Sequence, residues 1–217
     1  MSKKVTADKD SSFFWNSASE YLNNELPNIR KKSLNTVEAY RRSLNRYIDF
    51  LEEGKQVKRV DICYQDFNKS NLKDYLLFMK DCQHLSEKTC NLRLTAIRSL
   101  LAYASEESTD MTAIYVNAKM VKGLTVSGKA IEYFEDGQTK ALLKAPPVET
   151  KIGRRNQIIM VLGYDAGLRV SELIGLTLSS LHLDAEVPYV TILGKGVKYR
   201  NVPLMGKTIE HLTAYLK

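Results

Sequence analysis

The stretch that decides the fold runs Gly163-Tyr-Asp-Ala-Gly167-Leu-Arg169-Val-Ser-Glu172-Leu-Ile-Gly-Leu176 and then Tyr189-Val-Thr-Ile-Leu-Gly194-Lys195-Gly196-Val-Lys198-Tyr-Arg200-Asn-Val-Pro-Leu204. Glycine is the usual residue just past a helix end, so a helix ending at residues 165–167 is expected. A short second helix should open near Val170. Arg169 then lies at the corner between two helices.

The second half of this stretch predicts a β-hairpin. Side chains alternate in character from Tyr189 to Leu193 and again from Tyr199 to Val202. Between these runs lies Gly194-Lys195-Gly196, which is typical of a glycine-containing loop joining two antiparallel strands. Lys195 is therefore expected at the tip of the hairpin.

Each of these residues has an ordinary structural explanation when it is taken alone. Ser171 can cap a helix, and Glu172 can favour a first helical turn with Arg169 as its ion-pair partner. A lysine on an exposed hairpin, such as Lys195, can simply aid solubility. Short motifs are weak evidence singly; their joint order and spacing favour a functional interpretation.

The order Leu168-Arg-Val-Ser-Glu-Leu173, followed by Gly194-Lys-Gly-x-Lys198-x-Arg200-x-Val-Pro-Leu204, resembles the tyrosine recombinases, the phage-integrase family of enzymes that break and rejoin DNA. The resemblance implies that Arg169 is the first of two arginines that hold the scissile phosphate. It implies that Lys195 is a general acid. Glu172 would then help to hold the active site in shape.

Physical chemistry supports these roles. A planar, permanently charged guanidinium suits a phosphoryl-transfer transition state, whose negative charge spreads over the non-bridging oxygens. A lysine whose pKa is lowered by nearby cations can give the leaving 5′-oxygen the proton that makes it a 5′-hydroxyl. No His, Cys or carboxylate cluster at metal-binding spacing surrounds the stretch, and the family uses no metal, so no cofactor is expected.

Composition indicates a soluble globular protein of one large or two ordinary domains. The chain has 217 residues, of which 44% are hydrophobic and 26% charged. We expect a cytoplasmic protein without membrane contact, because no apolar run approaches the ~20 residues of a membrane span and the N-terminus lacks a signal-peptide core. The cysteines, Cys63, Cys82 and Cys90, are odd in number and without Cys-x-x-Cys spacing, which predicts neither a disulfide framework nor a zinc site.

The charge balance favours an acidic partner. The formal net charge is +7 and the pI about 9.2, a balance that is typical of nucleic-acid-binding proteins. Residues 28–59 alone hold nine basic and four acidic residues. The positive charge is therefore concentrated early in the chain.

The first part of the chain predicts a helical bundle. Apolar residues recur at helical spacing in five segments: 11–26, 33–54, 66–83, the segment that opens at Ser86, and 112–122. Pro27 should end the first helix. Leu92 is expected on the apolar face of the fourth. We expect a tail at residues 1–10, a helical domain at 11–122 and a linker at 123–134. Its second and fourth helices resemble the DNA-facing helices of the recombinases' SAM-like core-binding domain. That resemblance makes seven residues candidates for DNA contact: Thr36, Arg41, Arg42, Lys88, Asn91, Arg93 and Arg98.

The remaining residues, 135–217, resemble the first half of the family's α+β catalytic domain. Helices are expected at 135–145, at 154–166 with Ile158, Ile159, Val161 and Leu162 buried, and at 207–217 with Tyr215 in its core. The expected fold is thus mainly α with a small antiparallel β element.

The family's His-x-x-Arg segment with the second arginine and its tyrosine nucleophile have no match in this sequence. We therefore expect a fragment that is not catalytically competent and that leaves an apolar face uncovered. The favoured hypothesis is the N-terminal part of a site-specific recombinase that acts on double-stranded DNA through a 3′-phosphotyrosyl intermediate, with self-association into a tetramer implied by the resemblance. The alternative is a non-catalytic DNA-binding protein, truncated or degenerate, and a purely structural helical protein is a third hypothesis.

Overall fold

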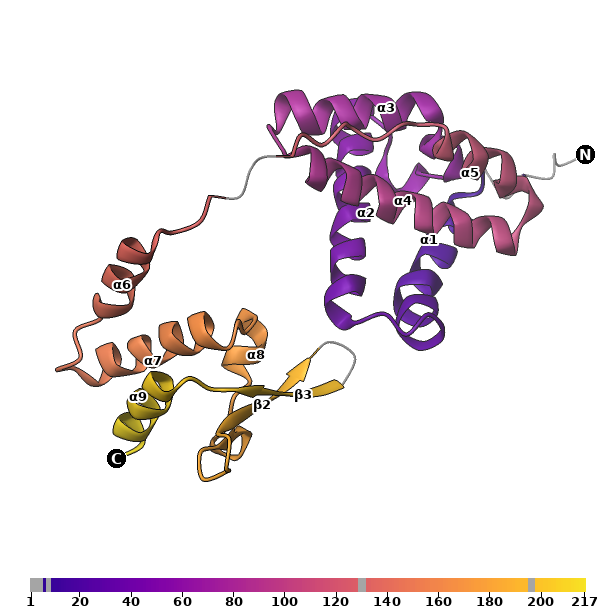
Figure 1. Cartoon of the computed structure of the whole chain (residues 1–217). Coiled ribbons are helices and arrows are strands. Elements are labelled where there is room, and N and C mark those ends of the chain that lie inside the picture. The colour runs from indigo at the N-terminus through magenta and orange to yellow at the C-terminus, as the bar shows by residue number, and fades with distance from the viewer. Residues whose placement is uncertain (1–5, 7–8, 129–131, 195–197) are drawn as a thin grey trace, which may run out of the picture. The chain divides into compact units, whose positions relative to one another are not determined.

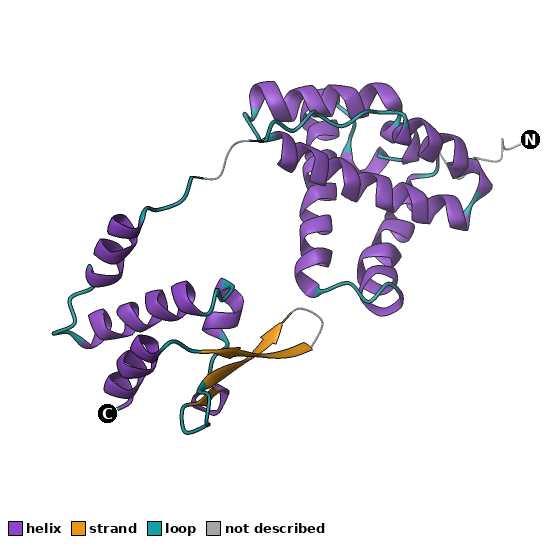
Figure 2. Cartoon of the chain, viewed as in Figure 1, coloured by secondary structure: helices purple, strands orange, loops and turns teal. Residues whose placement is uncertain are grey.

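In the computed structural model, which describes residues 6, 9–128, 132–194 and 198–217, the chain forms two compact units, residues 1–129 and 130–217 (Figure 1). The division falls within residues 123–134, where a linker is expected. Helices predominate, and the strands form one three-stranded antiparallel sheet (Figure 2). The predicted fold class is confirmed.

The first unit is a bundle of helices. Its elements are α1 (Ser11–Glu20) with its π-helical continuation η2 (Tyr21–Ile29), α2 (Leu34–Lys55), the short 3-10 turns η3 (Arg59–Asp61) and η4 (Tyr64–Phe67), α3 (Lys69–Leu77) with the π-helical η5 (Phe78–Cys82), α4 (Glu87–Glu107), η6 (Thr109–Met111) and α5 (Thr112–Lys119). Each predicted helix of this region is present. The third begins later than predicted, at Lys69, because the Asn68 side chain caps it through the backbone N–H of Asn71 at 3.0 Å.

The expectation that Pro27 ends the first helix is wrong, because the chain stays helical to Ile29. In an α-helix the proline ring meets the carbonyl four residues earlier. Here the last turns widen into a π-helix, whose bonds reach back five residues and move that carbonyl off the ring. The helix then closes with Arg30 N–H donating to the Glu25 carbonyl at 2.8 Å.

One local pattern occurs twice in this unit and sets where α2 and α4 begin. In each case a π-helical turn ends, a residue with positive φ follows, and a serine caps the next helix. Lys31 (φ 50°) precedes Ser33, and His84 (φ 52°) precedes Ser86. In both caps the serine hydroxyl accepts the backbone N–H three residues later at 3.3 Å and meets the threonine hydroxyl there at 2.9 Å. Each cap satisfies one of the free N–H groups at a helix start.

Aromatic rings form the centre of the first unit's core. Tyr47 packs against Phe67 and Tyr75 with ring centroids 4.9 and 5.0 Å apart, and Phe14 lies 5.2 Å from Phe67. All four side chains are almost completely buried. Leu92, which the helical pattern assigned to the core, is instead 68% exposed, so the buried face of α4 is narrower than predicted.

The second unit places a small sheet against helices. Its elements are α6 (Asp136–Lys144), α7 (Lys151–Asp165), α8 (Val170–Ile174), the 3-10 turn η7 (Leu178–Ser180), β1 (Leu181–His182), β2 (Tyr189–Gly194), β3 (Lys198–Pro203) and α9 (Gly206–Leu216). The predicted hairpin is confirmed, with Gly194 paired to Lys198 and Val190 to Val202. The edge strand β1 is an additional element, which pairs with β2.

The sheet and helices of this unit share a small apolar core. Val190 and Ile192 on β2 pack with Ile158 and Leu162 of α7 and with Leu212 of α9. Side chains on β2 and β3 alternate between faces, so Ile192, Val202 and Arg200 share the core-facing side. The same alternation places Thr191 and Asn201 on the opposite side, where the Thr191 hydroxyl donates to Asn201 Oδ1 at 2.9 Å.

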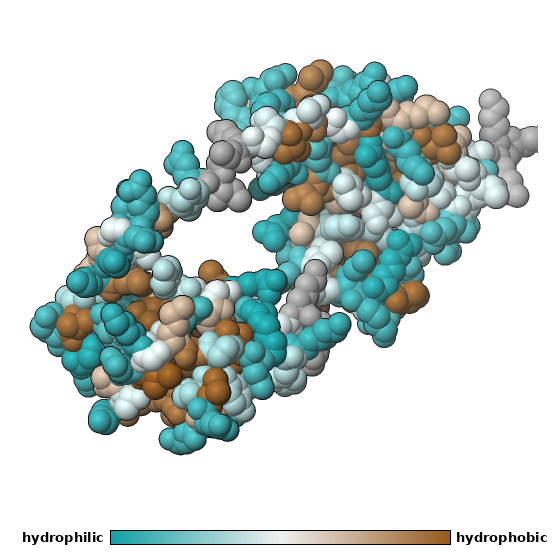
Figure 3. Space-filling model, viewed as in Figure 1, coloured by the Kyte–Doolittle hydropathy of each residue, from teal (hydrophilic) through white to brown (hydrophobic). Residues whose placement is uncertain are grey.

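Two side chains expected in this core lie outside it. Ile159 is 41% exposed and Tyr215 is 40% exposed. Both line an open apolar pocket of about 370 Å³ between α7, α9 and the segment from Leu173 to Leu181. Apolar side chains are also visible among hydrophilic ones on this unit's surface (Figure 3). Apolar side chains are thus exposed around this pocket on the described part of the unit.

Candidate active site

The corner that carries Arg169 is built as predicted. Helix α7 ends at Asp165, and Gly167 adopts φ +57°, a left-handed conformation that glycine accepts without strain. The chain then extends through Arg169, whose backbone φ of −68° and ψ of 152° make it the residue that caps α8. This geometry turns the Arg169 side chain out at the start of a short helix.

Glu172 is the buried centre of the site. Its side chain is only 3% exposed, yet both carboxylate oxygens are satisfied. Oε2 accepts the Arg169 backbone N–H at 2.8 Å, and Oε1 accepts Arg169 Nη1 at 2.9 Å. Glu172 thus caps α8 from within its first turn, a role that the sequence alone also allowed for Ser171.

Arg200 supplies the other half of the Glu172 contacts. Its Nη1 donates to Glu172 Oε1 at 2.9 Å and its Nη2 to Oε2 at 3.0 Å. These bonds from Arg200, followed by the Arg169 N–H, lower the pKa of Glu172 from 4.5 to about 2. The carboxylate therefore stays ionised across the physiological range.

Sequence reasoning gave Arg200 no role, although a signal was present. The run Lys198-x-Arg200-x-Val202 has the two-residue period of a strand, so Arg200 shares the face of Val202. Ile192, its cross-strand partner, is buried. The buried charge that needs a partner is the Glu172 carboxylate, 3% exposed, and Arg200, 40% exposed at the edge of the core, supplies it.

The Arg169 guanidinium is open toward solvent. Its side chain is 69% exposed, and within the ranges that the structure describes its side-chain hydrogen bonds run only through Nη1. The structural interpretation of Arg169 as an ion-pair partner of Glu172 is therefore correct. The ion pair uses only Nη1 of the three guanidinium nitrogens. Nε and Nη2 remain able to donate to an oxyanion.

Lys195 lies outside the described residues, so its position at the hairpin tip stays a prediction. The base of that hairpin is described and lies beside the carboxylate. A Cβ placed on Gly194 would come 3.6 Å from Arg200 Nη1 and 3.9 Å from Glu172 Oε1. The strand backbone at Gly194 thus lies close to the Arg200–Glu172 pair, and the tightest contact of such a Cβ would be with the Lys198 carbonyl oxygen at 3.3 Å.

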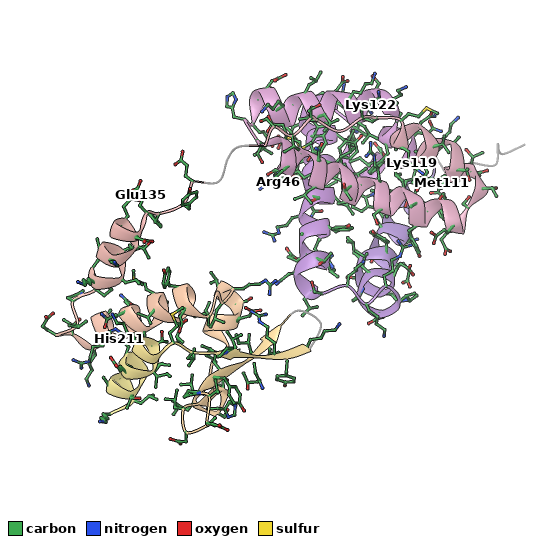
Figure 4. All side chains as sticks on the ribbon, viewed as in Figure 1. Arg46, Met111, Lys119, Lys122, Glu135 and His211 are labelled. Atoms are coloured by element: carbon green, nitrogen blue, oxygen red, sulfur yellow. The ribbon has the colours of Figure 1, made fainter. Side chains whose placement is uncertain are left out.

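The candidate DNA-contact residues fall into two groups. Arg42 and Lys88 are exposed, while Thr36, Arg41 and Arg93 are half-buried near the surface of α2 and α4. In the neighbouring part of α2, Arg46 also extends from the helix (Figure 4). The remaining two candidates, Asn91 and Arg98, are used inside the fold.

Asn91 holds the backbone that follows α5. Its amide nitrogen donates to the Leu124 carbonyl and its amide oxygen accepts the Leu124 N–H, both at 2.8 Å. Arg98 donates through Nε to the Ala118 carbonyl at 3.0 Å and through Nη2 to that of Val121. Burial lowers the pKa of Arg98. These contacts give both residues a structural role that their spacing did not reveal.

Neither metal-binding geometry nor a membrane span is found in the part of the chain that the structure describes. No three His, Cys, Asp or Glu side chains there gather in a way that would hold an ion, and no helix there is long and apolar enough to cross a bilayer. His182 has ordinary partners: Thr191 at 3.0 Å and the ring of Tyr189, stacked at 4.4 Å. His211 lies exposed on α9 (Figure 4).

Each of the two units matches a family model of known proteins. Residues 19–108 match the family model of the phage integrase N-terminal SAM-like domain, and residues 132–217 match that of the phage integrase family. The chain is 32% identical over 203 residues to tyrosine recombinase XerD of Staphylococcus epidermidis, covering 91% of this chain and 63% of that protein. It is 30% identical over 187 residues to XerD of Halalkalibacterium halodurans, covering 86% and 59%.

Solved structures show the same fold. The Tn1549 transposon integrase in complex with transposon right end DNA superposes with a TM-score of 0.64 at 18% identity, over 94% of this chain and 64% of that one. The XerH site-specific recombinase bound to palindromic difH substrate, in a post-cleavage complex, gives a TM-score of 0.62 at 18% identity, over 98% of this chain and 63% of that one. The chain thus spans about three fifths of the length of these proteins.

Proposed function

The chain belongs to the phage integrase family, and on that premise we propose that it is part of a site-specific tyrosine recombinase that cleaves and rejoins DNA through a 3′-phosphotyrosyl intermediate. In this proposal Arg169 binds the scissile phosphate and Lys195 protonates the leaving 5′-oxygen, which becomes the 5′-hydroxyl. Glu172 orients Arg169. The observation that carries the proposal is the Arg169 guanidinium, which Glu172 fixes through one nitrogen while 69% of the side chain stays exposed.

The charges of the cluster suit a phosphate. Arg169 and Arg200 carry two positive charges against the single negative charge of Glu172, so one positive charge remains. Because Arg200 is bonded to both carboxylate oxygens of Glu172, we assign that charge to the more exposed guanidinium of Arg169. A fixed donor of this kind stabilises the charge that develops on the non-bridging oxygens and needs no reorganisation when the reaction occurs.

We further propose that the second arginine and the tyrosine nucleophile of the reaction come from outside this sequence, which contains no His-x-x-Arg segment. A covalent mechanism requires an attacking group. Cleavage therefore calls for a protein in which these residues are joined to the rest of a catalytic domain.

The first unit is proposed to hold double-stranded DNA through α2 and α4. Thr36, Arg41, Arg42, Lys88 and Arg93 are the proposed contacts, because they lie at or near the surface of these helices. Basic side chains close together on a surface bind DNA phosphates and release the counterions of the DNA. The family also implies self-association on DNA, which we include in the proposal.

DNA binding is tested with the chain itself on a labelled duplex over a series of salt concentrations. We expect affinity to fall steeply with salt, and Arg41→Ala with Arg42→Ala to reduce the slope of log K against log salt by up to about 1.8, since each lost phosphate contact removes about 0.9. The matched control, Lys55→Ala with Arg59→Ala, removes the same charge from residues ion-paired to Asp74, Asp49 and Glu52. Equal slopes for both pairs would remove Arg41 and Arg42 from the proposed DNA contacts.

Catalysis is tested in a protein that carries this chain and the remaining catalytic groups. A nicked duplex, selected by binding from a random pool, traps the covalent protein–DNA intermediate. We expect Arg169→Ala to lower its rate of formation by ~10²- to 10³-fold, the usual cost of a lost oxyanion donor, with DNA affinity retained. DNA binding without any covalent product in the parent protein would favour the non-catalytic alternative.

A further inference from the structure

Arg200 is the residue whose contacts the proposed reaction leaves unexplained. Two of its nitrogens donate to one carboxylate: Nη1 lies 2.9 Å from Glu172 Oε1, and Nη2 lies 3.0 Å from Oε2. Arg169 donates its backbone N–H and one side-chain nitrogen to the same two oxygens. Each oxygen thus accepts two hydrogen bonds, which fills its acceptor capacity.

The position of Arg200 links two elements that carry proposed catalytic groups. It lies on β3, opposite Ile192 of β2 and close to Gly194, where the hairpin strand leads to Lys195. Glu172 lies in the first turn of α8, which Arg169 caps. The Arg200–Glu172 pair therefore ties the base of the hairpin to the Arg169 corner.

Charge balance shows what Arg200 adds beyond a mechanical tie. With Arg200 present, Glu172 is shared between two guanidinium groups, and Arg169 gives it a single side-chain bond. Without Arg200, the buried carboxylate would have Arg169 as its only side-chain partner among the residues that the structure describes. Its negative charge would then offset the charge meant for the phosphate and would repel the phosphate directly.

We propose that Arg200 is a positioning residue of the recombination reaction: by sharing Glu172 it leaves the Arg169 guanidinium net positive and free to bind the scissile phosphate. This inference rests on the proposed function. Arg200 itself touches no reacting atom in this scheme, since two of its nitrogens are bound to Glu172. Its effect passes through Glu172 to Arg169.

The experiment compares rates of covalent intermediate formation in the protein that carries the whole catalytic domain. The variants are Arg200→Ala, Arg200→Lys, Glu172→Gln and the double variant Arg200→Ala/Glu172→Gln, with Asn201→Ala as the matched control on the other side of the same strand. We expect Arg200→Ala to slow cleavage about 10- to 100-fold. Losses of this size are usual when a residue that only orients a functional side chain is removed, as is known for the hydrogen-bond partners of metal-binding side chains. DNA affinity should change less than twofold, and Asn201→Ala should cleave like the parent.

The double variant separates charge balance from simple bracing. Glu172→Gln removes the negative charge that, after Arg200→Ala, Arg169 alone would have to balance, so the double variant should cleave at least fivefold faster than Arg200→Ala. If Arg200 only held β3 against α8, the double variant would cleave as slowly as Arg200→Ala or more slowly, because glutamine at 172 does not restore the contact between β3 and α8. That result would overturn the proposal.

Arg200→Lys keeps the inference testable if the alanine variant does not fold. Lysine retains the charge and one hydrogen bond but not the paired geometry, so we expect a loss of less than tenfold. A lysine variant with no residual cleavage, in a protein that still binds DNA, would contradict the charge-sharing role. A parent protein that never cleaves would refute the proposed function and this inference with it, whereas a cleaving parent with a fully active Arg200→Ala variant would refute the inference alone.

Discussion

Replacing Asn91 by alanine distinguishes a residue that contacts DNA from one that stabilises the first unit. The Asn91 amide makes two hydrogen bonds with the backbone of Leu124, each 2.8 Å long. A hydrogen bond of this kind contributes about 0.5–1.5 kcal/mol, and alanine recovers up to about 0.7 kcal/mol as the better helix former. We therefore expect Asn91→Ala to lower the free energy of unfolding by about 1–2 kcal/mol.

Urea unfolding followed by tryptophan fluorescence measures this loss of unfolding free energy in the first unit, to which Asn91 belongs. Trp15 is the only tryptophan of the chain and packs against the core of the first unit. With a denaturant slope of about 2 kcal/mol/M, the midpoint should fall by roughly 0.5–1 M. The control is Leu92→Ala, on the next position of α4, which removes an exposed side chain and should shift stability by less than about 0.5 kcal/mol.

The same two variants are then compared for DNA affinity. Asn91→Ala should bind a duplex within about threefold of the parent under conditions where both are folded. An unchanged urea midpoint combined with a tenfold or greater loss of DNA affinity would refute the stabilising role. It would instead support Asn91 as a direct DNA contact.

Two further outcomes concern the second unit. Gly153→Ala should destabilise it by about 1–3 kcal/mol or more, because a Cβ there would lie 1.7 Å from the Pro147 carbonyl oxygen; hydrogen exchange of the α7 amides measures the loss, and unchanged protection would contradict it. A ¹³C carboxyl titration of the folded protein should give Glu172 a midpoint near 2 instead of the ordinary 4.5. Since the pKa is lowered by folding, the stability that ionised Glu172 contributes is complete above pH 4.5 and is lost as pH falls toward 2, and a midpoint near 4.5 would show that the Arg200 contact does not persist in solution.

Local sequence signals predicted the features of the site that depend on neighbouring residues. Gly167 and the apolar pattern before it placed the Arg169 corner, because a left-handed residue just past a helix end favours glycine. The alternation around Gly194 placed the hairpin in the same way. These features depend on conformational preferences within a few residues of the chain.

Features that depend on contacts between distant segments were not predictable from spacing. The partnership of Arg200 with Glu172 requires the register of β3 against β2 and the packing of α8 beside it. Asn91 and Arg98 lie on a helix that the resemblance assigned to DNA contact, yet both bind backbone groups more than fifteen residues away. The helical pattern assigned Tyr215 to a core, whereas the described residues leave it lining an open pocket.

The Asn91 contact also sets the length of the tether between the two units. Because Leu124 is held on α4, the connection to α6 comprises residues 125–135, which span at most about 40 Å when fully extended. If that contact were lost, the connection would start after Val121, which Arg98 holds, and its limit would rise to about 50 Å. The effective concentration of one binding module near another falls roughly as the −3/2 power of tether length. In the proposed DNA-binding role, one amide on α4 would therefore raise the local concentration of the second unit at a duplex bound by the first unit by a factor of about 1.4.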